Sequence, residues 1–197
     1  MIKKIIQVIE RKALKVLSYV DREKYKNMYP QYLRKLGINI PEDYRDGNMG
    51  FIDPNAHFDG NDYSLISIGK NTTISTGVDV LTHDYSIAVG LKSIDIHEPK
   101  ARFLKPVKIG SCCFIGERVI LLPGAVVGDN CIIGSGSIVS GKIPANSVAA
   151  GAPCRVITQT DKWTVKHVIN ADMVDIDIEE LQKRIKQNDR FDNYNPH

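Results

Sequence analysis

The sequence predicts an all-β solenoid, because a six-residue repeat runs through the middle of the chain. Between residues 108 and 149 an aliphatic side chain recurs at every sixth position, and the same spacing returns less regularly upstream. A unit this short cannot bury its apolar side alone, so it must stack on further copies of itself. Three units per coil would give flat parallel sheets without crossover helices. We call the residue at this recurring position the heading residue of its unit. The heading residues are Ile109, Ile115, Leu121, Val127, Ile133 and Val139, with Ile52, Phe58, Ile68, Ile74 and Val80 upstream.

A second position of the repeat, four residues after the heading one, holds small or β-branched side chains. These side chains would fill the narrower part of each edge, where the chain turns sharply into the next unit. Gly124, Asn130 and Gly136 recur in register and would supply permissive backbone at the corners. The second-position residues are Cys113, Val119, Ala125, Cys131, Ser137 and Ile143.

The segment before the solenoid, residues 1–48, is expected to be helical. Apolar residues recur at helical spacing through residues 2–20, opposite basic residues, which predicts an amphipathic helix. This helix would either dock on the body with a solvated basic face or make a peripheral contact with an anionic membrane. A second helical segment is expected over residues 21–36, ending at Gly37.

The solenoid is expected over residues 49–158, with one long interruption. The spacing between Val80 and Ile109 is 29 residues, where a multiple of six is expected. Residues 86–105 therefore leave the solenoid as an excursion loop that begins directly after His83 and Asp84. Insertions in repeat proteins gather on a binding face, so this loop is expected to be functional.

The remaining residues, 159–197, form a C-terminal appendage with one short predicted helix over residues 178–186. Glutamates stand in the first turn of that helix and basic residues near its end, which matches the helix dipole.

The composition indicates one folded domain with small appendages. At 197 residues and 43% hydrophobic, the chain can bury a core without disulfides. No apolar run approaches the roughly 18 residues that cross a bilayer, and the four cysteines lack metal-ligand spacing. These features favour a cytoplasmic location. A net charge of +3 without interleaved aromatic residues gives no reason to expect nucleic-acid binding.

The run from Ile109 to Ile157 contains ILLPGAVVGDNCIIGSGSIVS and ends in IPANSVAAGAPCRVI. It resembles the hexapeptide-repeat acyltransferases, and within them the galactoside and maltose acetyltransferases and the O-acetyltransferases of bacterial surface polysaccharides. The resemblance covers residues 50–158. It implies a left-handed parallel β-helix, a homotrimer, and acetyl-CoA bound between neighbouring subunits.

The resemblance also implies that His83, in THDYS, is the general base of the reaction. A sugar hydroxyl is a poor nucleophile until its proton is removed, and imidazole suits that task at neutral pH. The acceptor oxygen would attack the thioester carbonyl, a backbone N–H would stabilise the oxyanion, and the CoA thiolate would leave. Asp84 would either orient the imidazole or cap the turn, and the turn is favoured. His97 is a candidate to reach a neighbouring subunit's site.

Binding residues are assigned by the same resemblance. CoA brings phosphates, so Arg155, assisted by Lys142, would contact them. Phe114 would pack against the pantetheine arm, the acceptor or a neighbouring subunit. No metal ion is expected. The cofactor set is Glu117, Ser135, Ser140, Gly141, Lys142 and Arg155, and the acceptor set is Asn61, Asp62 and Asp84.

The leading hypothesis is an enzyme that moves an acetyl group from acetyl-CoA to a sugar hydroxyl of a surface-polysaccharide precursor. An amino-sugar N-acetyltransferase is the nearest alternative, because an amine acceptor can use the same base and cofactor groove. A zinc enzyme of the carbonic anhydrase type needs three converging imidazoles, and His57, His83 and His97 do not have the spacing for it. A noncatalytic β-helix scaffold is the third alternative, since a fold does not fix a function.

Overall fold

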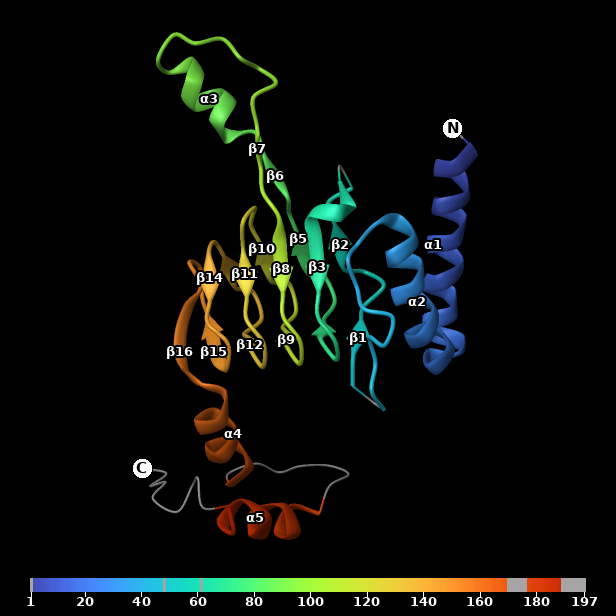
Figure 1. The fold of residues 1–197 in the computed structure, drawn as a ribbon, viewed down its shortest axis with the longest axis vertical. Helices are drawn as coiled ribbons and strands as arrows, with labels where there is room; N and C mark the ends of the chain where they lie inside the picture. Colours follow the sequence, from blue (N-terminus) through green and yellow to red (C-terminus); the bar gives the residue numbers. More distant parts are fainter. Residues whose placement is uncertain (1, 48, 61, 170–176, 189–197) are drawn as a thin grey trace.

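The computed structural model is a stack of short strands flanked by helices (Figure 1). It describes residues 2–47, 49–60, 62–169 and 177–188. The two predicted N-terminal helices are confirmed as α1 (Ile2–Val20) and α2 (Arg22–Leu36). Gly37 ends α2 in the left-handed conformation, with φ at 111°, and its N–H donates to the Arg34 carbonyl at 2.9 Å. Within the described residues no helix is long and apolar enough to cross a bilayer.

The strands form three parallel sheets that the chain visits in rotation, and one passage through the three sheets is a coil. Strands of successive coils lie in register, which confirms the prediction of stacked parallel sheets. In spatial order, the first sheet holds β1 (Phe51–Ile52), β4 (Thr73–Ile74), β9 (Phe114–Ile115), β12 (Ile132–Ile133) and β15 (Ser147–Ala150); the second holds β2 (His57–Phe58), β5 (Asp79–Val80), β10 (Ile120–Leu121) and β13 (Ile138–Val139); the third holds β3 (Ile66–Ile68), β8 (Val107–Ile109), β11 (Val126–Val127) and β14 (Lys142–Ile143).

The core of the stack consists of the repeat positions. Every predicted heading residue is buried, and so is every predicted second-position residue. The assignment of Ile143 to the second position is wrong, because Ile143 pairs in register with Val127 and is therefore itself a heading residue. The turn at Ser140 and Gly141 shortens this edge of the coil by two residues, so the six-residue period breaks there.

The corners are built from residues with positive φ, as predicted. Gly124, Asn130 and Gly136 have φ values of 89°, 55° and 70°. Other glycines allow neighbouring coils to approach each other: a Cβ at Gly69 would lie 2.4 Å from backbone atoms of Gly110 and Ser111 on the next coil. Coil stacking therefore requires the absence of a side chain at that position.

Each end of the stack is covered. At the start, α2 packs on the first coil, where Tyr25 is fully buried and its hydroxyl donates to the Ile52 carbonyl at 2.7 Å. At the other end, β16 (Arg155–Gln159) pairs antiparallel with β15. These elements protect the unpaired sheet edges from further strand pairing.

Two helices follow the stack. The predicted C-terminal helix is confirmed as α5 (Ile178–Lys186). A further helix, α4 (Thr160–Ile169), was not expected from the sequence. Its residues include several β-branched ones, which have low helix propensity, so the sequence gives a weak helical signal. Val165 and Val168 are buried, and tertiary packing stabilises this helix.

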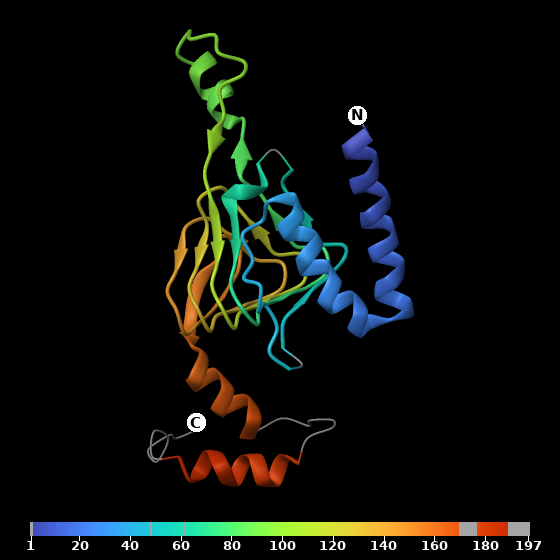
Figure 2. The same cartoon turned by 45° about the vertical axis from the view of Figure 1, so that its right-hand side comes forward.

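The excursion leaves the stack at residues 86–105 as predicted and projects away from it in both views (Figures 1 and 2). It is more ordered than the expected loop, because it contains α3 (Ser86–Lys92). Its base is a two-stranded antiparallel ribbon of β6 (His83–Asp84) and β7 (Phe103–Leu104). The ribbon fixes the backbone at His83.

Gly69→Ala should lower the free energy of unfolding by about 1–3 kcal/mol, because the added methyl group forces two coils apart. Denaturant unfolding followed by circular dichroism measures the change. Gly90→Ala in α3 is the matched control, since a Cβ there would meet nothing within 4 Å. Equal stability of the two variants would contradict close coil contact at Gly69.

Candidate active site

His83 lies at the corner between the second and third sheets, where the excursion begins. Its ring Nδ1 contacts Oδ2 of Asp59, which lies at the same corner of the preceding coil. The same Asp59 oxygen accepts hydrogen bonds from the backbone N–H of Thr82 at 3.0 Å and from its hydroxyl at 2.8 Å. The Asp59 side chain is 6% exposed and the His83 side chain 26%. A buried carboxylate therefore orients a ring that reaches the surface.

Asp84 has a different role from Asp59. Its carboxylate accepts a hydrogen bond from the Ser86 backbone N–H at 2.7 Å, which holds the pKa of Asp84 below its usual value. This contact confirms the favoured interpretation that Asp84 caps a turn. The ring of Tyr85 packs edge-on against His83, with centroids 5.5 Å apart.

Four of the predicted cofactor residues lie together. Ser140, Gly141, Lys142 and Arg155 line one pocket of about 190 Å³. The pocket lies at the same corner as His83, two coils further along the stack. Neighbouring strands of a sheet are about 4.8 Å apart, so His83 and the pocket are separated by about 10 Å along the stack.

The other two predicted cofactor residues lie elsewhere. Glu117 and Ser135 stack on each other at the corner between the first and second sheets, where the Glu117 N–H donates to the Ser135 hydroxyl at 3.1 Å. Phe114 precedes that corner on the first sheet and is 46% exposed. Within one chain, the predicted cofactor residues therefore lie at two different corners.

Cys154 also lines the pocket with Arg155. Burial raises the pKa of the Cys154 thiol, so it stays protonated at neutral pH and is a poor nucleophile. The Arg155 guanidinium donates to the Cys154 carbonyl at 2.9 Å, which holds the cation at the pocket wall.

The predicted acceptor residues give less information. Asn61 lies outside the described residues. Asp62 accepts hydrogen bonds from the Ser64 N–H at 3.0 Å and the Ser64 hydroxyl at 2.6 Å, and it begins the short 3-10 helix η1 (Tyr63–Leu65). A sugar contact by Asp62 stays a prediction.

The remaining histidines are dispersed. His57 contacts Asp79 at 3.2 Å on the exposed side of the second sheet, and His97 is exposed in the excursion. His167 stacks on Trp163 in α4. Among the described residues, no three His, Cys, Asp or Glu side chains are grouped so that they could hold a metal ion.

The repeat region matches a known family. Residues 106–141 match the bacterial transferase hexapeptide family (six repeats). The galactoside O-acetyltransferase of Escherichia coli K12 is 31% identical over 152 residues, which cover 68% of this chain and 73% of that protein. The chain belongs to the bacterial hexapeptide-repeat transferases.

Other hexapeptide-repeat transferases are similar over comparable lengths. The putative lipopolysaccharide biosynthesis O-acetyl transferase WbbJ of Escherichia coli K12 is 31% identical over 156 residues, covering 69% of this chain and 79% of that protein. The solved maltose O-acetyltransferase of Clostridium difficile 630 has a TM-score of 0.51 and 27% identity, covering 78% of this chain and 88% of that one. A galactoside acetyltransferase solved with coenzyme A has a TM-score of 0.51 and 25% identity, with 86% of each chain covered.

Asp59 is the residue of this hexapeptide-repeat transferase that sequence reasoning missed. It stands 24 residues before His83, within the irregular spacing between Phe58 and Ile68. Strand register would have found it, because β2 pairs with β5 and thereby stacks the corner after Phe58 on the corner after Val80.

Asp59→Ala should lower the free energy of unfolding by about 1–3 kcal/mol, because the buried Thr82 N–H and hydroxyl lose their acceptor. Thermal and denaturant unfolding measure the loss. Asp79→Ala is the matched control, since it removes a carboxylate that contacts a histidine at the surface, and it should cost less than about 1 kcal/mol. A stable Asp59→Ala variant would show that the buried contacts do not hold this corner.

Proposed function

We propose that this protein transfers an acetyl group from acetyl-CoA to a sugar hydroxyl, with His83 as the general base. The observation that carries the proposal is the buried Asp59 carboxylate against the ring of His83, at the same corner as the pocket lined by Arg155. The relatives named as galactoside and maltose O-acetyltransferases support it. A scaffold would have no use for an oriented histidine at the base of an excursion.

The Asp59 carboxylate determines which proton His83 can accept. An ionised carboxylate at Nδ1 favours the tautomer with the N–H on that nitrogen, which leaves the lone pair on Nε2. Nε2 then removes the proton of the acceptor hydroxyl as the oxygen attacks the thioester carbonyl. When the tetrahedral intermediate collapses, the carbon–sulfur bond breaks, and the His83 imidazolium returns the proton to the CoA thiolate. The acetyl ester forms in one transfer, with no acyl-enzyme.

The CoA phosphates would bind where Arg155 and Lys142 place two cations beside one pocket. Ser140 and Gly141 border the same pocket and would offer backbone and hydroxyl contacts to the pantetheine arm. The pantetheine arm would then extend along this corner and place the thioester near His83.

The protein acts as a homotrimer of left-handed β-helices in this proposal. Glu117 and Ser135 lie at a different corner from Arg155 within one chain, so they can contact the same CoA only if a neighbouring subunit supplies them. A trimer would bring the first-to-second corner of one subunit against the second-to-third corner of the next. The proposed units are residues 1–48, the β-helix 49–158 and the appendage 159–197, and a cytoplasmic location fits the donor.

His83→Ala should lower turnover at least about a hundredfold, within the usual range for loss of a general base, and should leave acetyl-CoA affinity nearly unchanged. Thiol release from acetyl-CoA, with galactosides and maltose as acceptors, measures turnover. His57→Ala is the matched control, because that ring also contacts an aspartate but lies at the surface, and it should retain activity. Unchanged turnover in His83→Ala would remove His83 from the mechanism.

Arg155→Ala should weaken acetyl-CoA binding by about tenfold, the effect of losing one charge-assisted phosphate contact. Isothermal titration of the purified protein measures the affinity, with one site per chain expected. Arg11→Ala removes an equal charge from α1 and serves as the control. The absence of acetyl-CoA binding by the unaltered protein would favour the scaffold alternative.

A further inference from the structure

α1 presents its apolar side chains to solvent. Among the α1 side chains that the structure describes, Leu14 is the buried apolar one. Apolar side chains along one face of the helix are 51–79% exposed. Helical spacing places these residues on one continuous surface. An exposed apolar surface of this kind marks a binding site. We define the α1 stripe as Ile5, Ile6, Ile9, Val16 and Val20.

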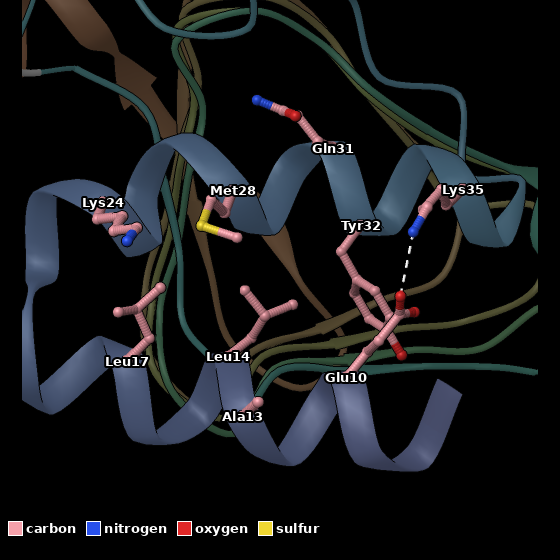
Figure 3. Close-up of a pocket in the computed structure, with 9 residues that line it drawn as sticks. All are labelled: Glu10, Ala13, Leu14, Leu17, Lys24, Met28, Gln31, Tyr32 and Lys35. Atoms are coloured by element: carbon pink, nitrogen blue, oxygen red, sulfur yellow. Dashed lines mark hydrogen bonds and ion pairs between the residues drawn. The ribbon is translucent and has the colours of Figure 1, made fainter. Parts of the chain in front are cut away.

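α1 is the outermost element at the start of the coil stack. Both ribbon views show α2 between α1 and the coils, with no described element on the far side of α1 (Figures 1 and 2). The two helices pack along one side of α1, where Leu14 is buried and Leu17 is partly buried. The Tyr32 hydroxyl donates to the Gln7 carbonyl at 3.1 Å. Lys35 pairs with Glu10 at 3.1 Å (Figure 3). α2 therefore covers one edge of α1 and leaves the stripe open.

A groove between the two helices extends the apolar surface. It has a volume of about 430 Å³, and Figure 3 shows Leu14, Leu17 and Met28 along it. Ala13 also lines the groove and stands one helical turn after Ile9, so the groove adjoins the stripe. The apolar surface is thus wider than a single row of side chains.

Positive charge is concentrated on the same helix. Residues 2–20 hold five basic residues and one acidic residue, a charge of +4, whereas the whole chain carries +3 and the rest of it therefore −1. The acidic residue, Glu10, is paired with Lys35. Lys12 and Lys15 are exposed beside the stripe, whereas Arg11 is exposed on the opposite side of the helix. An apolar face flanked by cations is the pattern of a helix that lies in the interface of an anionic bilayer.

We propose that α1 binds the surface of an anionic phospholipid bilayer, with the α1 stripe among the acyl chains and Lys12 and Lys15 at the headgroups. The helix is 19 residues long and lies in the membrane plane without crossing it. Charge selects this occupant, because a second copy packed stripe against stripe would bring two +4 helices together. The binding is independent of the acetyltransferase activity, and it would hold the coil stack beside membrane-linked glycan acceptors.

Flotation of the full-length protein with vesicles tests the proposal. Vesicles of phosphatidylcholine with about 30% phosphatidylglycerol should carry the protein upward, and pure phosphatidylcholine vesicles should carry little. Sodium chloride at about 0.5 M should reduce the binding, because it screens the cations. The double substitution Ile9→Gln and Val16→Gln, at two exposed positions, should lower partitioning about tenfold, and so should Lys12→Gln with Lys15→Gln. Val89→Gln, at a residue 74% exposed on α3, is the matched control and should bind as the unaltered protein does.

Three results would overturn the proposal. The first is failure of the unaltered protein to bind anionic vesicles, and the second is binding by the stripe and lysine variants that equals that of the unaltered protein. The third is a lower oligomer mass of the stripe variant in light scattering without vesicle binding, which would make the stripe an interface between copies. Circular dichroism checks that the variants keep their helices. Titration with acetyl-CoA, which needs no membrane, separates failure of this proposal from failure of the proposed enzyme activity.

Discussion

Coil stacking in register is the constraint on which the rest of this structure depends. Each coil buries its heading residues only when the next coil lies directly above it, since two-residue strands have no stability of their own. Gly69 shows how close the stacking is, because its Cβ position is occupied by backbone of the next coil. The same register brings Asp59 to His83 although 24 residues separate them in sequence. The contact between Asp59 and His83 is thus a consequence of the solenoid geometry.

The candidate functional residues lie where the repeat is broken. The excursion leaves the corner between the second and third sheets after His83, and the shortened edge at Ser140 and Gly141 lies at that same corner two coils later. A regular six-residue repeat presents the same flat surface on every coil. Departures from it create a protruding ribbon at one point and a pocket beside Arg155 at another. The two irregularities therefore define the two ends of one proposed reaction path.

The first coil explains the N-terminal helices. Its strands would expose open sheet edges, which invite pairing with other chains. α2 covers these edges with Tyr25 and Tyr29, which are both buried. The apolar face of α2 that carries these two residues is therefore turned toward the coils. α1 contacts α2 mainly through Leu14 and Leu17, so the wider apolar face of α1 is left for another surface. Capping the solenoid and the proposed membrane binding are thus assigned to two separate helices.

The sequence by itself determined the repeat, the buried heading residues, the helix end at Gly37 and α5, and it pointed to His83 as the candidate general base. These features are local: a period, a cap or a motif is written in consecutive residues. Tertiary structure alone decided that Asp59 orients the imidazole and that Ile143 is a heading residue. It also decided that Val165 is buried and helps to stabilise α4, and that Glu117 lies at a different corner from Arg155. Each of these depends on which coil stacks on which, and irregular spacings hide that register from a linear reading of the chain.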